Sequence, residues 1–399
     1  MIKIKTLLLK WVRTHIKRGL SRTLAGFCAI AFFTCFFSLS HLTKLSAAST
    51  STLLGIYYGA AGVNNITDIQ AMENWQGKKH AVVNLFANWC DSPATLDGLF
   101  NQQLVNIWNN QSVPMISWEP FLCHPSCNPT DDEVRLATPG DVETRAVNGE
   151  FDIYLSNWAD RMKVFLSGPD GVYNTADDRR AYIRLAHEMN GSWYPWAPAP
   201  GVNPASDYIN MWQRVKSIFF NREMEWTHLQ WVWTVNYDDY LGYPAEQLYP
   251  GDQYVDWVGI SGYNWGNATP WLGWKNPEQT FGAMLYRLRA LTKRPIALTE
   301  FATTAATSTG INTSAKSQWI TSVLNYVLTQ NIKMIVWFNE TKETDWKAFG
   351  GYSGDTYFDY SGKRYNAFST YKSGVNSSSF VPPDTANPRL LTDAQFAGL

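Results

Sequence analysis

The sequence predicts a single (β/α)8 barrel, in which eight parallel strands close into a barrel surrounded by helices. Eight short apolar runs recur along the chain, each of the length of a buried strand and rich in Val, Ile, Leu or aromatic residues. Stretches with helical periodicity lie between them, for example at 208–220, 280–291 and 314–330. A doubly wound open sheet normally carries a glycine-rich phosphate loop after its first strand, and the sequence has none there. Eight strand–helix units therefore favour the barrel.

The expected strands are distributed so that one barrel takes up most of the 399 residues. They comprise residues 53–58, 81–86, 114–118, 181–186, 229–234, 257–261, 295–299 and 334–338. The interval between the third and fourth is the longest, and we interpret it as surface loops with an amphipathic stretch at 158–166. It includes an acidic loop formed by Asp170, Asn174, Asp177 and Asp178. We interpret this loop as a solvated turn with a helix cap, and calcium binding is the alternative.

Residues 1–48 form a separate N-terminal segment. It carries eight Lys and Arg and no acid, then an apolar run at 24–42, and then the small residues Ser46, Ala47 and Ala48. This order is typical of a secretory signal peptide. An uncleaved membrane anchor is the alternative, because the run is close to the length that spans a bilayer. We expect the remainder to be exported in both cases, as a secreted or periplasmic protein or as a membrane-anchored protein that faces outward.

The rest of the chain divides into a barrel domain at 49–374 and a C-terminal tail at 375–399. The tail is rich in Ser, Pro, Asn and Asp, a composition that predicts loose packing. Without residues 1–48 the chain has 25 Lys and Arg against 34 Asp and Glu, a balance of −9. Because no basic patch is left, the composition argues against a nucleic-acid partner. We expect a monomer.

Cysteine usage fits an exported protein. Cys28 and Cys35 lie in the N-terminal apolar run, and Cys90, Cys123 and Cys127 remain after it. A local disulfide within the tight 123–127 loop is expected, and a bond from either of its cysteines to Cys90 is the alternative. Zinc is disfavoured, because no second Cys/His pair follows at the spacing of a zinc finger.

Two carboxylates stand where two of the expected strands end. Glu188 follows the fourth strand, with His187 before it and Trp193 and Trp196 after it in a loop that contains Gly and Pro. Glu300 ends the seventh strand. An acid beside exposed aromatic planes suits a sugar ring, which has apolar faces and a rim of hydroxyl groups. The C-terminal ends of barrel strands meet at one mouth of the barrel. Two carboxylates there are the least that hydrolysis of a glycosidic bond usually requires.

Four segments together resemble glycoside hydrolase family 26, the endo-β-mannanase family, over roughly residues 52–370. They are Arg184 to Trp196, the turn Tyr263-Asn264-Trp265-Gly266, Thr299-Glu300-Phe301, and Trp337 near the last strand. The resemblance implies a retaining endo-β-glycanase that hydrolyses β-1,4-mannan by double displacement, with a polysaccharide substrate and with no metal or cofactor. The family also includes enzymes that cut β-1,3-1,4-glucan or β-1,3-xylan, which are alternatives here.

The resemblance also implies roles for individual side chains. Glu188 matches the acid/base, Glu300 the nucleophile, Tyr263 the tyrosine that hydrogen-bonds the nucleophile, and His187 the histidine beside the acid. A phenol donor at Glu300 would orient that carboxylate and keep it ionised. We expect Arg184 to be buried against a carboxylate and to support the site rather than touch sugar.

Three tryptophans are candidates for contact with sugar. The resemblance implies this role for Trp193 and Trp337, and alternation along the last strand allows Trp337 to face the mouth. Trp118 is a further candidate because it stands at the end of the third expected strand. Packing in the core is the alternative for each of them. In many family members an arginine after the last-strand tryptophan grips mannan; Phe338 occupies that position here, which weakens mannan as the substrate.

Three functions other than that of a secreted glycosidase are alternatives for such a chain. A catalytically silent carbohydrate-binding barrel would have lost one of the two carboxylates, and both are present. A membrane-tethered enzyme that acts on the cell's own envelope would retain residues 1–48. A Ser-His-Asp hydrolase is disfavoured, because the sequence has no Gly-x-Ser-x-Gly elbow.

Overall fold

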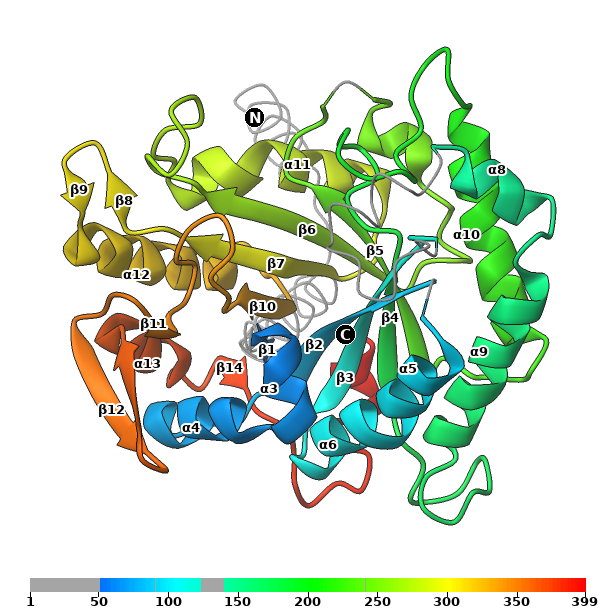
Figure 1. The fold of residues 1–399 in the computed structure, drawn as a ribbon, viewed down its shortest axis with the longest axis horizontal. Coiled ribbons are helices and arrows are strands. Elements are labelled where there is room, and N and C mark those ends of the chain that lie inside the picture. The colour runs from blue at the N-terminus through cyan, green and yellow to red at the C-terminus, as the bar shows by residue number, and fades with distance from the viewer. Residues whose placement is uncertain (1–50, 90, 123–139, 241) are drawn as a thin grey trace, which may run out of the picture. The chain divides into compact units, whose positions relative to one another are not determined.

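The computed structural model describes residues 51–89, 91–122, 140–240 and 242–399, which belong to one compact unit. Eight parallel strands close into a barrel, because the first strand pairs with both the second and the last (Figure 1). These strands are β1 (Thr52–Tyr57), β2 (Val82–Asn88), β3 (Val113–Glu119), β4 (Ala181–Leu185), β5 (Leu229–Asn236), β6 (Trp257–Asn264), β7 (Ile296–Thr303) and β10 (Met334–Phe338). The predicted fold class and all eight predicted strands are confirmed.

Helices surround the strands (Figure 1). They are α3 (Gly59–Asn65), α4 (Thr67–Gln76), α5 (Pro93–Gly98), the π-helix η1 (Leu99–Gln103), α6 (Leu104–Asn109), α8 (Val142–Val147), α9 (Asp152–Leu166), α10 (Ala205–Phe220), the 3-10 helix η2 (Ala245–Leu248), α11 (Pro277–Leu291), α12 (Thr313–Thr329), α13 (Ser369–Val375) and α14 (Asp393–Phe396). The sequence explains where α11 begins, since Asn276 and Gln279 form a capping box and Pro277 occupies the first turn. In the described ranges, no helix is long and apolar enough to cross a membrane. The predicted N-terminal segment and Cys90, Cys123 and Cys127 lie outside the described residues.

Short strands complete the fold outside the barrel. They are the pair β8 (Ala306–Thr307) and β9 (Gly310–Ile311), the antiparallel sheet of β11 (Phe349–Gly351), β12 (Thr356–Tyr360) and β13 (Lys363–Ala367), and β14 (Phe380–Val381), which pairs with β1.

The C-terminal segment closes the end of the barrel where the strands begin. Leu391 and Phe396 are fully buried against the apolar lower layer of the barrel interior. Tyr182 and Trp257, at the starts of β4 and β6, each donate a hydrogen bond to the carbonyl of Phe396 (3.0 and 3.1 Å). The expectation that residues 375–399 pack loosely is therefore wrong, because a few apolar side chains in a mostly polar segment are enough to cover the small opening of the barrel.

The acidic loop before β4 satisfies its own carboxylates. Asp178 is buried, accepts a hydrogen bond from the backbone N–H of Asn174 (2.7 Å) and lies 2.8 Å from His228. Asp177 accepts from the backbone N–H of Asp170 (3.2 Å). These contacts are typical of a tight turn, and a turn rather than a calcium site was the first interpretation of this loop.

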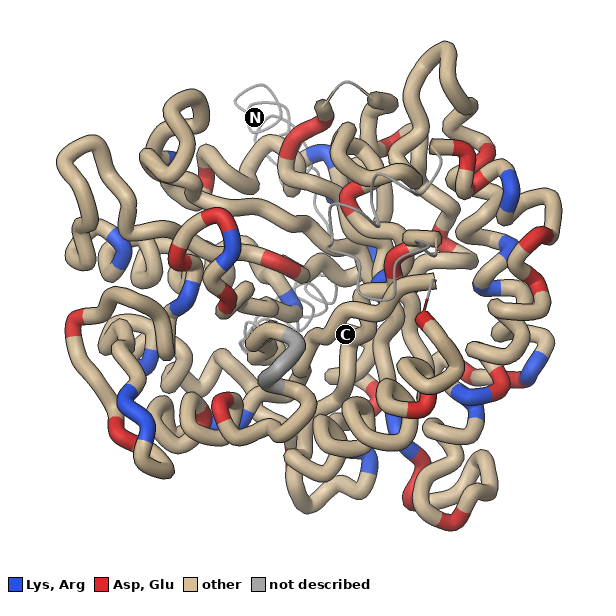
Figure 2. The backbone as a smooth tube through the Cα atoms, viewed as in Figure 1, with Lys and Arg blue, Asp and Glu red and all other residues tan. Residues whose placement is uncertain are grey.

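Acidic and basic residues are interspersed along the described part of the chain (Figure 2). Some of them pair between neighbouring elements. Arg287 of α11 pairs with Asp239 of the loop after β5 (2.7 Å) and with Glu246 of η2 (2.5 Å). Exposed ion pairs add little to the free energy of unfolding. The two ion pairs of Arg287 instead hold the loop after β5 and η2 against α11.

Candidate active site

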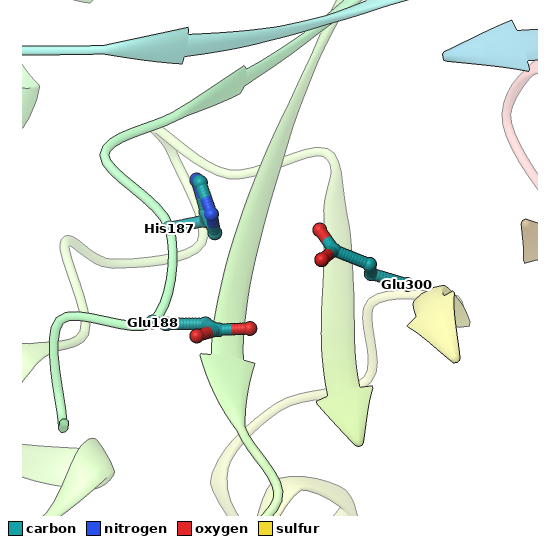
Figure 3. Close-up of side chains that lie close together, drawn as sticks. All are labelled: His187, Glu188 and Glu300. Atoms are coloured by element: carbon teal, nitrogen blue, oxygen red, sulfur yellow. The ribbon is translucent and has the colours of Figure 1, made fainter. Parts of the chain in front are cut away.

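A bend in the backbone after β4 brings Glu188 into the mouth. Ala186 and Glu188 have φ angles of 45° and 55°, in the left-handed region that non-glycine residues rarely adopt. Such strain is typical of functional sites, where the surrounding structure holds it in place. The bend ends the strand alternation, so that His187 and Glu188 both lie at the mouth although they are adjacent in sequence (Figure 3). A ring nitrogen of His187 and one carboxylate oxygen each of Glu188 and Glu300 all lie within 4.8 Å of one another.

A β-bulge in β7 directs Glu300 into the same mouth. Ile260 of β6 pairs with Leu298, but the next residue, Ser261, pairs with Glu300, so β7 contains one extra residue at this point. Thr299 points into the barrel, where its hydroxyl lies 3.1 Å from that of Thr234. Strict alternation would then point Glu300 toward the helices, and the bulge reverses this direction.

Two donors hold Glu300. Arg184 donates to Oε2, and the Tyr263 hydroxyl donates to Oε1 (2.5 Å). Arg184 is fully buried, and it also donates to the hydroxyls of Ser117 (2.7 Å) and Ser261 (3.3 Å). The structure thus places Arg184 and Tyr263 where the sequence analysis expected them. Acceptance of hydrogen bonds by both oxygens is the pattern of an ionised carboxylate held in one orientation.

Glu188 has a different environment. Its burial, together with the nearby charge of Glu300, raises the pKa of Glu188 to about 7. The charge of Arg184 and the hydrogen bonds from Trp193 and Ser261 oppose this rise without cancelling it. Glu188 therefore holds a proton below about pH 7, whereas the carboxylate of Glu300 pairs with the guanidinium of Arg184.

His187 is a neutral neighbour of the acid. It is fully buried, and its burial, with the charges of Arg184 and Lys342, lowers the pKa of its imidazole well below the ordinary value. Nε2 lies 3.1 Å from the Tyr194 hydroxyl and 3.9 Å from a carboxylate oxygen of Glu119. An uncharged imidazole at this point can accept or donate one hydrogen bond without adding charge to the site.

Trp193 lies over the backbone next to the acid. Its indole Nε1 donates to Oε2 of Glu188 (2.8 Å), and the side chain is partly exposed. Gly191 makes this position accessible, because a Cβ there would come within 2.5 Å of the Trp193 ring. Of the three tryptophans that were expected to touch sugar, Trp193 is the one that lies at the two carboxylates.

Trp118 and Trp337 pack among helices instead. Both are fully buried. Trp118 stacks on Trp158 of α9 with ring centroids 4.1 Å apart, and Trp337 packs edge-on against Phe301 (5.1 Å) and Tyr371 (5.4 Å). The expectation that these two tryptophans contact sugar is contradicted, because each points away from the barrel interior.

On the last strand, β10, the residues that alternate with Trp337 face the barrel interior. Met334 and Val336 belong to the apolar interior of the barrel, so alternation directs Phe338 to the mouth. Phe338 stacks on Tyr57 of β1 (4.9 Å, 25°) and packs edge-on against Tyr263 (5.7 Å). From the sequence, Phe338 stood out only as a departure from the family pattern. Both alternating sets of this strand, Met334/Val336/Phe338 and Ile335/Trp337, are apolar, so the sequence carries no signal for which set faces inward.

Truncation of Trp337 to Ala should therefore act on stability. We expect a loss of about 3–5 kcal/mol in the free energy of unfolding, the usual cost of removing a buried large aromatic side chain. Activity per folded molecule should persist. Thermal unfolding and kinetics on this variant test the prediction, with Trp271→Ala as a control because Trp271 is 78% exposed. A normal melting temperature with a large loss of activity would instead restore Trp337 to the sugar site.

Comparisons with known proteins find matches among glycoside hydrolases. Residues 46–293 match the model of glycosyl hydrolase family 26. The chain is 33% identical over 290 residues to Endoglucanase H of Acetivibrio thermocellus, an alignment that covers 70% of this chain and 27% of that protein. It is 24% identical over 248 residues to Mannan endo-1,4-beta-mannosidase A and B of Caldalkalibacillus mannanilyticus, covering 56% of this chain and 44% of that protein.

Solved structures share the barrel. The structure of a GH26 beta-mannanase from Bacteroides ovatus superposes with a TM-score of 0.56 at 16% identity, covering 86% of this chain and 93% of that one. The catalytic domain of a GH26 endo-beta-1,4-mannanase from Bacillus sp. JAMB-750 gives a TM-score of 0.56 at 17% identity, covering 88% and 90%. At these identities the likeness shows the fold. The family match over residues 46–293 shows more, and the chain belongs to glycosyl hydrolase family 26.

Proposed function

We propose that this protein is a retaining endo-β-glycanase that hydrolyses internal bonds of a polysaccharide by double displacement. One observation carries the proposal: oxygens of Glu188 and Glu300 lie within 4.8 Å of each other. Retaining glycosidases place their two carboxyl groups roughly 5–5.5 Å apart, whereas inverting enzymes need about 6.5–9.5 Å to admit a water molecule between them.

The two environments assign the two roles. In the first step an oxygen of Glu300 attacks the anomeric carbon, and Glu188 gives its proton to the departing glycosidic oxygen. In the second step Glu188 takes a proton from water, the water oxygen attacks the same carbon, and the carboxylate of Glu300 leaves. Formation of the ester removes the negative charge of Glu300, one of the two causes that raise the pKa of Glu188. The pKa of Glu188 should then fall, which suits its second role as a base.

Activity on natural polysaccharide should decline as the pH rises through about 7. The sign follows from the role of Glu188: the first step needs its protonated form, and its pKa in the free enzyme is raised to about 7. A profile of kcat/KM against pH on the wild-type enzyme measures this. An alkaline limb two or more units away from 7 in the wild type would contradict the assignment.

For the substrate, β-1,4-mannan is the first candidate. The mannosidase relative and the family resemblance support it. A β-1,3-1,4-glucan is the second candidate, for two reasons. The relative with the higher identity is an endoglucanase, and the apolar Phe338 stands where many family members place an arginine that grips mannan.

Release of reducing ends from galactomannan, glucomannan, lichenan and β-1,3-xylan by the purified protein tests the proposal, with Glu300→Gln as the inactive control. Highest activity on the two mannans supports the first candidate, and highest activity on lichenan supports the second. Binding without hydrolysis of any polymer would indicate a silent carbohydrate-binding barrel. We further propose that the enzyme acts outside the cytoplasm, on the basis of residues 1–48; a mature N-terminus near Ser49 would support export with cleavage, and an intact one would support the anchor.

A further inference from the structure

We propose that Tyr240 forms a second sugar-binding platform, on the leaving-group side of the cleaved bond. The inference rests on the proposed function, because it takes Glu188 as the acid. Tyr240 lies in the loop after β5. It is 54% exposed, and its ring centroid is 6.3 Å from that of Trp193.

The hydrogen bond between Trp193 and Glu188 identifies the side of the cleft. The proton of Glu188 goes to the glycosidic oxygen that departs, so a ring bonded to Glu188 lies beside the departing sugar. The rings near Glu300 form a different group, in which Tyr263 contacts Trp265 and Trp346 (6.0 and 4.8 Å). Trp193 and Tyr240 therefore belong to the leaving-group side, with Trp193 nearer to the reacting bond.

The rings of Trp193 and Tyr240 do not stack on each other. The planes of Trp193 and Tyr240 are tilted by 39° at a centroid distance of 6.3 Å, so neither ring covers the other. Two such planes in succession suit two successive sugars of one chain, because each sugar has an apolar face that can lie on an aromatic ring.

The backbone of Tyr240 is fixed to the segment that carries the acid. Its N–H donates to the carbonyl of Asn190 (2.8 Å), two residues after Glu188. The Asn190 side chain donates in turn to Asp239 (2.9 Å), which also pairs with Arg287 of α11 (2.7 Å). Binding on a ring whose backbone is already ordered costs little conformational entropy. This connection distinguishes Tyr240 from singly exposed aromatic residues, which are common on protein surfaces.

The test compares two substrates on the same variants. One is a hexasaccharide of the polymer that the screen identifies, which places sugars at both leaving-group positions. The other is an aryl β-glycoside with the same sugars on the nucleophile side, whose leaving group is a single aryl ring. For Tyr240→Ala we expect KM for the hexasaccharide to rise about five- to tenfold, the scale of one aromatic contact. Values for the aryl glycoside should stay within about twofold, because its leaving group does not reach Tyr240.

Two further variants sharpen the comparison. Tyr240→Phe keeps the ring and should behave like the wild type. Tyr286→Ala removes a tyrosine that is 78% exposed on α11 and should change neither substrate. Equal losses of Tyr240→Ala on both substrates, or no loss on the hexasaccharide, would overturn the platform while an active wild type preserves the proposed function. A wild type that cleaves neither substrate would overturn both.

Discussion

Replacement of Glu300 by Ala is expected to reduce kcat on the natural polysaccharide by on the order of 10⁵-fold or more, as for the loss of other covalent nucleophiles. Without this carboxylate no glycosyl-enzyme can form, and Arg184 and Tyr263 both lose the carboxylate oxygen that accepts their hydrogen bond. Breaking a buried ion pair costs about 3–5 kcal/mol in the free energy of unfolding, so Glu300→Gln, which retains an acceptor oxygen, is the variant for kinetics. Stopped assays on the folded Gln variant measure the effect.

Addition of azide to the Glu300→Ala variant gives a second, independent signature. Azide can attack the anomeric carbon from the face that Glu300 occupies, while Glu188 still protonates the leaving group. The product should be a glycosyl azide of inverted configuration, and retention should not return. Near-normal hydrolysis by folded Glu300→Ala or Glu300→Gln would remove Glu300 from the mechanism.

Replacement of Glu188 by Ala should have an effect that depends on the leaving group. A natural polysaccharide needs a proton on the departing oxygen, so we expect its first-step rate to fall by about 10²–10⁴-fold, the usual contribution of a general acid. An activated aryl glycoside leaves as a stable phenolate and needs little help. Pre-steady-state measurement of the first step on both substrates should show rates that diverge.

The second step provides the control for Glu188. Glu188→Ala also lacks the base that activates water, so the glycosyl-enzyme should accumulate on the aryl glycoside, and azide should restore turnover with a retained glycosyl azide. An equal loss on both substrates, without accumulation, would mean that Glu188 has a structural role only.

The periodicity of the sequence was sufficient for the barrel, and the limits of this reasoning appear at the strand ends. Strands β6 and β7 continue to Asn264 and Thr303, beyond the apolar runs that end at 261 and 299. Most of the added residues, apart from Phe301, are polar or small, and some of them form hydrogen bonds at the mouth, such as that of Asn264 to Thr303 (2.8 Å). Such contacts leave no hydrophobic pattern in the sequence.

Side-chain direction was the harder part of the prediction. Alternation sorts the residues of a strand into two sets, but it does not say which set is inside. Because of this ambiguity Trp337 was expected at the mouth of the barrel, where the structure places Phe338. At Glu188 and Glu300 alternation itself fails, since a left-handed bend and a β-bulge bring both carboxylates inward. The chemical nature of their neighbours, rather than periodicity, identified these two residues from the sequence.

The configuration of the first product tests the central account most directly. The ¹H NMR spectrum of a reaction started with wild-type enzyme and the oligosaccharide of choice shows the anomeric proton of the new reducing end before mutarotation. Two displacements at one carbon, by Glu300 and then by water, predict that the β-anomer appears first and the α-anomer only later. Initial appearance of the α-anomer would show a single displacement and would contradict the assignment of Glu300 as the nucleophile.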